Sequence, residues 1–145
     1  MTVPPEITNV VHKHIVSLLR SYPAYSTNLP GGIWKGIAPN NTLYPHLIMA
    51  YTSGLDLVAF AGQYVGSGLE YLLKVIDASP SETKAVASFN WVETVLMENN
   101  GINASGLAYV HFDYLRPFNL PVVEDDTTFQ QVGRSYKVFV DPLGF

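Results

Sequence analysis

The change from a strand pattern to a helix pattern after residue 77 constrains the fold of this chain more than any other feature. Residues 69–77, LEYLLKVID, form an apolar run that is typical of a strand. The next stretch, Ser79-Pro80-Ser81-Glu82, has the form of a capping box, with serine at the N-cap, proline at the first helical position and glutamate at the third. The pattern predicts a helix that begins at this box and stops at Gly101, which can adopt the left-handed conformation.

Two helices with apolar faces at helical spacing are predicted. The first has Pro4 and Pro5 in its first turn and is ended by Pro23. Its apolar face consists of Ile7, Val11, Ile15 and Leu18, widened by Val10, His14 and Leu19. The face of the second helix consists of Ala85, Phe89, Val92 and Leu96, with Val95 and Met97 on its flanks and Trp91 farther out.

Between these helices the sequence alternates between loops and strands. Residues 26–32 form a loop, and residues 33–38, IWKGIA, predict a short strand with a glycine inside it. Residues 46–52 follow Pro45, which suits the start or the edge of a strand. Both faces of this strand are largely apolar, so we expect both to be covered. Residues 53–68 hold four of the eleven glycines, which fits either a flexible loop or an irregular hairpin.

The last third of the chain predicts a long hairpin. Strands at 106–118 and 128–141 are joined by NLPVVEDDT, which we expect to be a loose tip. The second of these strands places Val132, Tyr136, Val138 and Val140 on one face. The order of elements predicts a single α+β domain over residues 1–145. We expect a mainly antiparallel sheet of about four or five strands with two helices packed on one face.

The chain has few charges for its size. It is 48% hydrophobic and 14% charged, whereas soluble domains carry about 25% charged residues. This shortage favours an oligomer in which neighbouring subunits cover part of the surface. The alternative is a monomer whose surface is kept in water by Ser, Thr, Asn and Gln. A net charge of −4 and the absence of a basic block argue against sequence-specific nucleic-acid binding.

Other function classes are disfavoured by what the sequence lacks. The chain has no cysteine, which excludes a disulfide framework and a thiolate zinc site. No secretory signal pattern is found near the N-terminus, and no apolar run approaches the roughly 18 residues of a membrane span. The glycines of GQYVGSGLE do not have the spacing of a phosphate-binding loop. We therefore expect a protein of a reducing cytoplasm with no cofactor, no metal and no membrane partner.

The histidines offer little catalytic chemistry. On a helix, His12 and His14 point about 160° apart and cannot chelate one metal ion. His14 lies on the apolar face, where a core histidine is expected, and His46 stands alone beside a proline. His111 and Asp113 are two apart on a strand and share a face. This pair leaves open a small α+β enzyme or ligand-binding domain, although the sequence nominates no third partner.

Two surface features allow both a structural and a functional interpretation. The acidic group Glu124-Asp125-Asp126 can be a solvated hairpin tip, a repulsive lining for a DNA passage, or a docking point for a basic partner. Trp91 can close the edge of the core or anchor a neighbouring molecule. Trp34 lies in a predicted strand, where a core position is expected.

Taken in order, these segments resemble a known family. An amphipathic helix is followed by GGIWKGIAPNNTLYPHLIMAYTSG, a glycine-rich stretch, LEYLLKVIDASPSETKAVASFNWVETVLMENNG and YLRPFNLPVVEDDTTFQQVGRSYKVFV. The pattern resembles the tail terminator proteins, also called tail completion or head–tail joining proteins, of long-tailed double-stranded DNA bacteriophages. The resemblance covers nearly the whole chain and lies in the order of elements and local signatures. The stretch 53–68 is longer and richer in glycine than the family pattern.

The resemblance implies a structural, non-enzymatic role with no catalytic residues to transfer. Such proteins form a homohexameric ring at the tail–neck junction of the virion, assembled in the host cytoplasm. The ring caps the tail tube and joins it to the neck or connector protein, and viral DNA passes through the lumen without sequence-specific binding. A head-closure or adaptor ring of the same neck is the near alternative. The expected axial contacts lie in segments 55–67 and 119–128, and the candidate interface residues are Trp91, Asp56, Tyr64, Glu124, Asp125 and Asp126.

Overall fold

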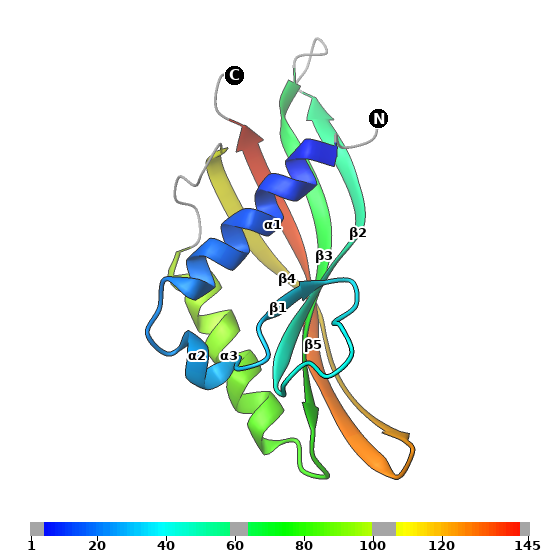
Figure 1. Ribbon diagram of the computed structural model, residues 1–145. Helices are drawn as coiled ribbons and strands as arrows, with labels where there is room; N and C mark the ends of the chain where they lie inside the picture. The colour runs from blue at the N-terminus through cyan, green and yellow to red at the C-terminus, as the bar shows by residue number, and fades with distance from the viewer. Residues whose placement is uncertain (1–4, 59–63, 100–106, 143–145) are drawn as a thin grey trace.

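The computed structural model describes residues 5–58, 64–99 and 107–142 as a five-stranded sheet with helices on one side (Figure 1). The sheet order is β1-β2-β3-β5-β4. The β1–β2 pair is parallel and the other pairs are antiparallel, which confirms the α+β class. The elements in chain order are α1 (Pro5–Arg20), α2 (Tyr25–Asn28), β1 (Ile33–Lys35), β2 (His46–Val58), β3 (Tyr64–Ala78), α3 (Thr83–Glu98), β4 (Leu107–Glu124) and β5 (Thr127–Pro142).

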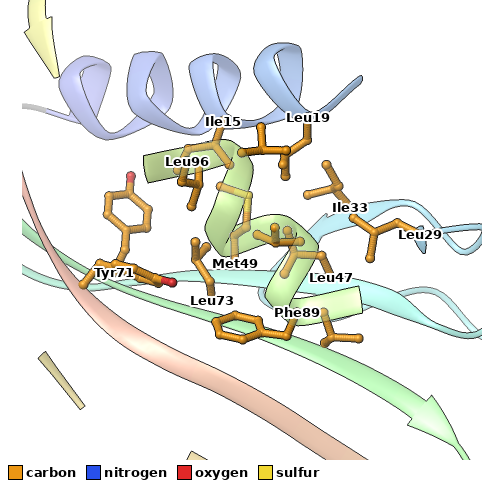
Figure 2. Close-up of a cluster of buried hydrophobic side chains, with 14 of the residues drawn as sticks. Ile15, Leu19, Leu29, Ile33, Leu47, Met49, Tyr71, Leu73, Phe89 and Leu96 are labelled. Carbon is orange, nitrogen blue, oxygen red and sulfur yellow. The ribbon is translucent and has the colours of Figure 1, made fainter. Parts of the chain in front are cut away.

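The hydrophobic core lies between the sheet and helices α1 and α3, as Figure 2 shows. Successive side chains of a strand point to opposite faces, so alternate residues of β2, β3 and β5 enter the core. The helix residues Ala85, Phe89, Val92 and Leu96 are all buried, which confirms the predicted face of α3. The buried sheet residues that line this face include Leu47, Met49, Leu69, Tyr71, Leu73, Val75, Val132, Tyr136 and Val138.

The apolar face of α1 is turned slightly from its predicted position. Val11 and Ile15 are fully buried as expected, but Leu19 completes the stripe and Leu18 is only half-buried. The i, i+4, i+8 spacing of these three residues is the row that one helix presents to a layer beneath it. After Arg20 the chain turns at once into the short helix α2, so the predicted loop at 26–32 is partly wrong.

Helix α3 begins later than the capping box predicts. Its first residue is Thr83, and the residue before it, Glu82, makes no side-chain cap. The Ser79 hydroxyl accepts a hydrogen bond from the Ser81 amide at 3.1 Å, and the Ser81 hydroxyl accepts one from the Thr83 amide at 3.3 Å. The serines thus satisfy the local amides in a turn before the helix, which is the competing use of such residues. The predicted stop at Gly101 lies outside the described residues.

The strands of both hairpins are longer than predicted. The stretch 53–58 continues β2 and 64–67 belongs to β3, with irregular register near Thr52 and Val58. The irregular hairpin is therefore the correct alternative, and a flexible segment over 55–67 is wrong for the described part. Strand β4 continues to Glu124, so the predicted loose tip is also wrong.

The tip of the β4–β5 hairpin is a two-residue turn. Asp125 and Asp126 have φ angles of 49° and 63°, and Glu124 pairs directly with Thr127. Positive φ at both central residues matches a type I′ turn, whose twist fits two antiparallel strands. Asp tolerates this conformation better than most residues other than glycine. The β4–β5 pair therefore forms a stiff arm that ends in two aspartates (Figure 1).

Candidate interaction surfaces

A groove lies on the face of the sheet opposite the helices. It has a volume of about 550 Å³ and lies between the loop 36–44 and the β4–β5 arm. Its floor combines the apolar side chains of Ile48 and Ile76 with Lys74, whose ammonium donates to the Gln131 side chain at 3.0 Å. The lining combines apolar side chains with polar ones, such as Asn40, Glu124 and Gln131. Within the described residues no three His, Asp or Glu side chains gather to hold a metal ion, so the groove suits a segment of another protein with both apolar and polar side chains better than a reaction.

The loop over this groove is held at both ends. Gly31 donates its amide to the Pro45 carbonyl at 3.1 Å, and a Cβ at Gly31 would lie 1.9 Å from the Leu43 carbonyl oxygen. At the other end of the loop, Gly36 has φ of 81° and ends β1 inside the stretch predicted as strand. The ring of Tyr44 lies 5.8 Å from that of Phe129 on the arm. The loop is therefore fastened across the sheet and covers Ile48 on its second face.

Large apolar side chains are exposed on the loop and the arm. Ile37 is 87% and Leu43 66% exposed on the loop, and Val123 is 70% and Leu120 54% exposed on the arm. Single exposed apolar residues are common on protein surfaces, but neighbouring ones mark interaction sites. Ile37 lines the groove, and Leu120 lies on the groove side of the arm, opposite Gln131, so this end of the sheet is a candidate contact surface. Val123 lies on the other face of the arm, because its neighbour Val122 lines the groove.

The structure brings the acidic residues together at the end of the arm. Glu124, Asp125 and Asp126 are all exposed, as a solvated tip requires. Glu124 also lines the groove. The side chains of the tip have water on their outer side, so a basic partner can reach them without disturbing the core. Their role at an interface stays a prediction.

Trp91 closes the edge of the core. It is half-buried against the core cluster, and its ring makes an edge-to-face contact with Tyr22, with centroids 6.4 Å apart and planes at 82°. The Tyr22 hydroxyl accepts a hydrogen bond from Asn99 at 2.9 Å, which ties the end of α1 to the end of α3. Trp91 therefore closes the edge of the core of its own chain, and its role as an anchor for a neighbouring molecule stays a prediction.

Asp56 and Tyr64 lie in paired strands rather than in a loop. In the β2–β3 hairpin, Asp56 is opposite Ser67 and Tyr64 is opposite Val58. Residues 59–63 between them lie outside the described part of the chain. Neither residue is brought near the acidic tip, because the end of β2 at Val58 and the β4–β5 turn lie at opposite ends of the sheet (Figure 1).

Burial decides the chemistry of three histidines. His14 is buried on α1 as expected, and burial lowers its pKa. Burial lowers the pKa of His12 as well, helped by the nearby charge of Lys35. His46 is buried beneath the loop, and burial lowers its pKa although a hydrogen bond to the Leu43 carbonyl acts the other way. Neutral imidazoles in such places are packing residues.

The alternative site has no described side chains. His111 and Asp113 belong to β4 and lie opposite Phe139 and Lys137, and the structure supports no statement about where their side chains point. Within the described ranges, no group of three His, Asp or Glu side chains could hold a metal ion. Trp34 is half-buried and donates to the Gly31 carbonyl at 2.8 Å, outside the main core cluster where it was expected.

A polar cluster between α3 and the sheet was missed by sequence reasoning. Glu93 accepts from Arg134 at 2.5 Å and from the Tyr136 hydroxyl at 2.8 Å. The Arg134 guanidinium also lies 4.5 Å from the centre of the Tyr114 ring. Burial, and then the bond to Glu93, raise the pKa of Tyr136 well above its usual range. A glutamate four residues after Phe89, on the core side of a helix, was the available signal.

No helix in the described part of the chain is both long and apolar enough to cross a membrane.

Comparisons with known proteins inform the fold. No protein-family model matches the chain, and no curated protein matches it. Among solved structures, a chain from the virion of a native gene transfer agent particle superposes with a TM-score of 0.73 at 15% identity, over 95% of this chain and 99% of that one. A second solved chain has a TM-score of 0.44 at 15% identity, over 91% and 92% of the two chains. At this identity, the first match establishes the fold alone, which 95% of this chain shares with a component of that virion.

Proposed function

We propose that this protein is a structural component of a phage-like virion, with no enzymatic activity. The single observation that carries the proposal is the fold shared with a chain of a gene transfer agent virion over nearly the full length of both chains. Fold alone does not fix function. The low content of charged residues and the exposed apolar side chains around the groove support a protein whose surface is covered by neighbours.

Within the virion, the proposed role is that of a tail terminator. Six copies form a ring that caps the last ring of tail tube protein and presents its other face to the neck or connector, while DNA passes through the lumen. The mechanism is geometric: each face of the ring matches one partner, and tube growth stops because the exposed face no longer matches tube protein. The β4–β5 arm with its acidic turn supports an axial contact, because it extends beyond the helix-covered part of the sheet (Figure 1).

Negative-stain electron microscopy tests this role. Purified protein is imaged alone and after mixing with tail tubes from the same virus. Six-fold rings, or a cap on one end of each tube, are expected. A variant with Glu124→Gln, Asp125→Asn and Asp126→Asn is the matched comparison, and it should form rings but cap fewer tubes. If the wild-type protein forms no ring and leaves both tube ends bare, the terminator role is wrong.

A different neck ring protein, such as a head-closure or adaptor protein, is the second candidate. The same structural match supports it equally, because the match is to a chain of a virion and does not say where in the particle that chain lies. Caps on purified connectors together with bare tube ends would favour it. A His111→Ala variant that assembles normally but loses binding of a metal ion or small molecule would instead revive an enzyme or ligand-binding role.

A further inference from the structure

Both edges of the sheet are protected at one end and open at the other. At the β2 edge, β1 pairs with Leu47–Met49 only. The Leu47 amide donates to the Gly32 carbonyl at 3.0 Å, and the Gly36 amide donates to the Met49 carbonyl at 2.8 Å. Within the described ranges, no strand pairs with the outer side of residues 50–58. An uncovered edge of this length is a template for strand addition.

The direction of the backbone groups can be followed across the whole sheet. Because the Leu47 amide points outward to β1, its partner Val75 directs its backbone groups to β5. Directions alternate along each strand, so the even-numbered residues of β5 point to β3. The β4 residues opposite those even positions then direct their own amides away from β5, toward the free edge. Three such β4 residues are Val110, Pro117 and Pro121.

Pro117 and Pro121 protect the part of the β4 edge that leads to the acidic turn. Proline has no amide hydrogen, so the outward positions 117 and 121 cannot donate to an added strand. Asn119, the one outward residue between the two prolines, keeps its backbone amide, and its side-chain amide is bound to the Glu82 carboxylate. Natural sheets use prolines in this way to prevent edge-to-edge pairing. The described sequence of β4 before residue 117, residues 107–114, contains no proline and keeps its outward donors.

Protection ends at the same level on the two edges. The register runs from Met49 to Leu73, from Leu73 to Arg134 and from Arg134 to Pro117. Nearer the C-terminal end of β2, the register runs from Asp56 to Ser67, from Ser67 to Val140 and from Val140 to Val110. The last residue covered by β1 is therefore level with the first protective proline. The open stretches 50–58 and 107–114 lie level with each other on opposite edges.

The open stretches also have matching directions. Strand β2 is antiparallel to β3, β3 to β5 and β5 to β4, so β2 and β4 run in opposite directions. When one copy is placed beside another in the same orientation, β4 of the first meets β2 of the second as an antiparallel pair. Such a head-to-tail contact uses two different surfaces, and it closes into a ring when the rotation between copies allows.

We propose that residues 107–114 of one copy pair with residues 50–58 of the next copy, which joins the sheets of neighbouring subunits into one antiparallel sheet. The proposal rests on the proposed function, since it supplies the lateral contact of that ring. The occupant of each open edge is a second copy of this chain because the two edges match in length, level and direction. The protected ends are left for contacts along the ring axis.

Two proline variants of the full chain test the pairing. Val110→Pro removes an outward amide from the open part of β4, and Val123→Pro removes one from the protected part. Both keep the bonds to β5, because both amides point away from it. Native mass spectrometry, with and without tail tubes, should show at least a tenfold loss of ring for Val110→Pro. Val123→Pro changes the arm that faces an axial partner, so its rings should be unchanged in the measurement without tubes. Melting temperatures confirm that both variants fold.

Hydrogen exchange of the wild-type protein gives a readout that needs no variant. Amides in 50–58 and 107–114 should exchange more slowly in assembled rings than in protein diluted to monomers. Normal rings from Val110→Pro, or protection of 107–114 without 50–58, would overturn the head-to-tail pairing while leaving a ring intact. If the wild-type protein assembles neither alone nor on tubes, the ring itself is wrong, and the pairing falls with it.

Discussion

The two faces of the central sheet are built from alternate residues of the same strands but are covered in different ways. On the helix side, Leu47 and Leu73 are fully buried beneath α1 and α3 (Figure 2). On the other side, Ile48 is buried beside the loop 36–44, with which it lines the groove, and Leu120 is 54% exposed on the arm. Stability is therefore concentrated on one face, and the surface that can bind a partner on the other.

The same contrast explains why a chain with so few charges can still fold as a unit. One face of the sheet and two helices are enough to build a core, since burial of a large apolar side chain contributes about 1.5–3 kcal/mol. The open face is then free to carry apolar residues, which the proposed assembly would bury. The following predictions test this division, beginning with the largest expected effect.

Removing a core leucine should cost far more than removing an open-face leucine. Leu73→Ala leaves a cavity in the core and should lower the free energy of unfolding by about 3 kcal/mol. Leu120→Ala, the matched change on the arm, should lower it by no more than about 0.5 kcal/mol. Urea denaturation of the monomer measures both. Equal losses would contradict the division between the faces.

Glu93 should show that polar groups also contribute on the helix side. Glu93→Gln removes the charge that faces Arg134 and weakens the bond from Tyr136. Because both partners are mostly buried, a loss of about 1–2 kcal/mol in unfolding free energy is expected. The exposed Glu98→Gln on the same helix is the control and should change nothing measurable. A neutral Glu93→Gln would mean that solvent screens this cluster.

The buried His14 should make stability depend on pH. Burial lowers its pKa below the ordinary value of 6.5, so the unfolded chain binds more protons than the folded one as the pH falls. The free energy of unfolding should thus decrease below about pH 6.5, by at most about 1.4 kcal/mol per pH unit for one proton. His14→Gln should remove the part of this slope that His14 contributes and leave the parts due to His12 and His46, whereas Lys13→Gln should leave the whole slope unchanged. Denaturation at pH 7.5 and at pH 5.5 measures the difference.

The smallest effect is expected at the tip of the arm. Asp125→Asn combined with Asp126→Gly fits the positive φ angles of the turn and should stabilise the protein by about 0.5 kcal/mol. The same change removes two charges, so capping of tail tubes should weaken while stability rises. Glu124→Gln, which removes a charge but leaves the turn unaltered, separates the two causes. Unchanged capping in both variants would remove the acidic tip from the interface.

Features set by local spacing could be predicted from the sequence. The order of the main elements, the buried face of α3 and the hairpin between β4 and β5 all follow from periodicity within a few residues. The helix start could not be predicted, because the hydroxyls of Ser79 and Ser81 serve a turn as readily as a helix cap. The continuation of β4 beyond residue 118 was missed because Asn119 and Pro121 are typical of a loop until the strand is known to be an edge.

The candidate surfaces were harder to predict than the helices and strands, because they depend more on tertiary structure. The position of Glu124, Asp125 and Asp126 at a hairpin end was predicted, because the turn is local. The groove joins the loop 36–44 to Ile76 and Phe129, which are far apart in sequence, so no local pattern could indicate it. The level match between Met49 and Pro117 is likewise a property of the register, which exists only once the strands are aligned.

The strand order also determines when the sheet can be completed during folding. The pairs β2–β3 and β4–β5 join neighbours in sequence, but β3 must pair with β5, across α3 and β4, as Leu69 does with Val138. Contacts between such distant segments form slowly because a long loop must close first. On the ribosome, one side of β3 has no partner until β5 has been synthesised. The newly made chain is therefore most exposed to aggregation in the centre of its future sheet, in the interval before β5 inserts.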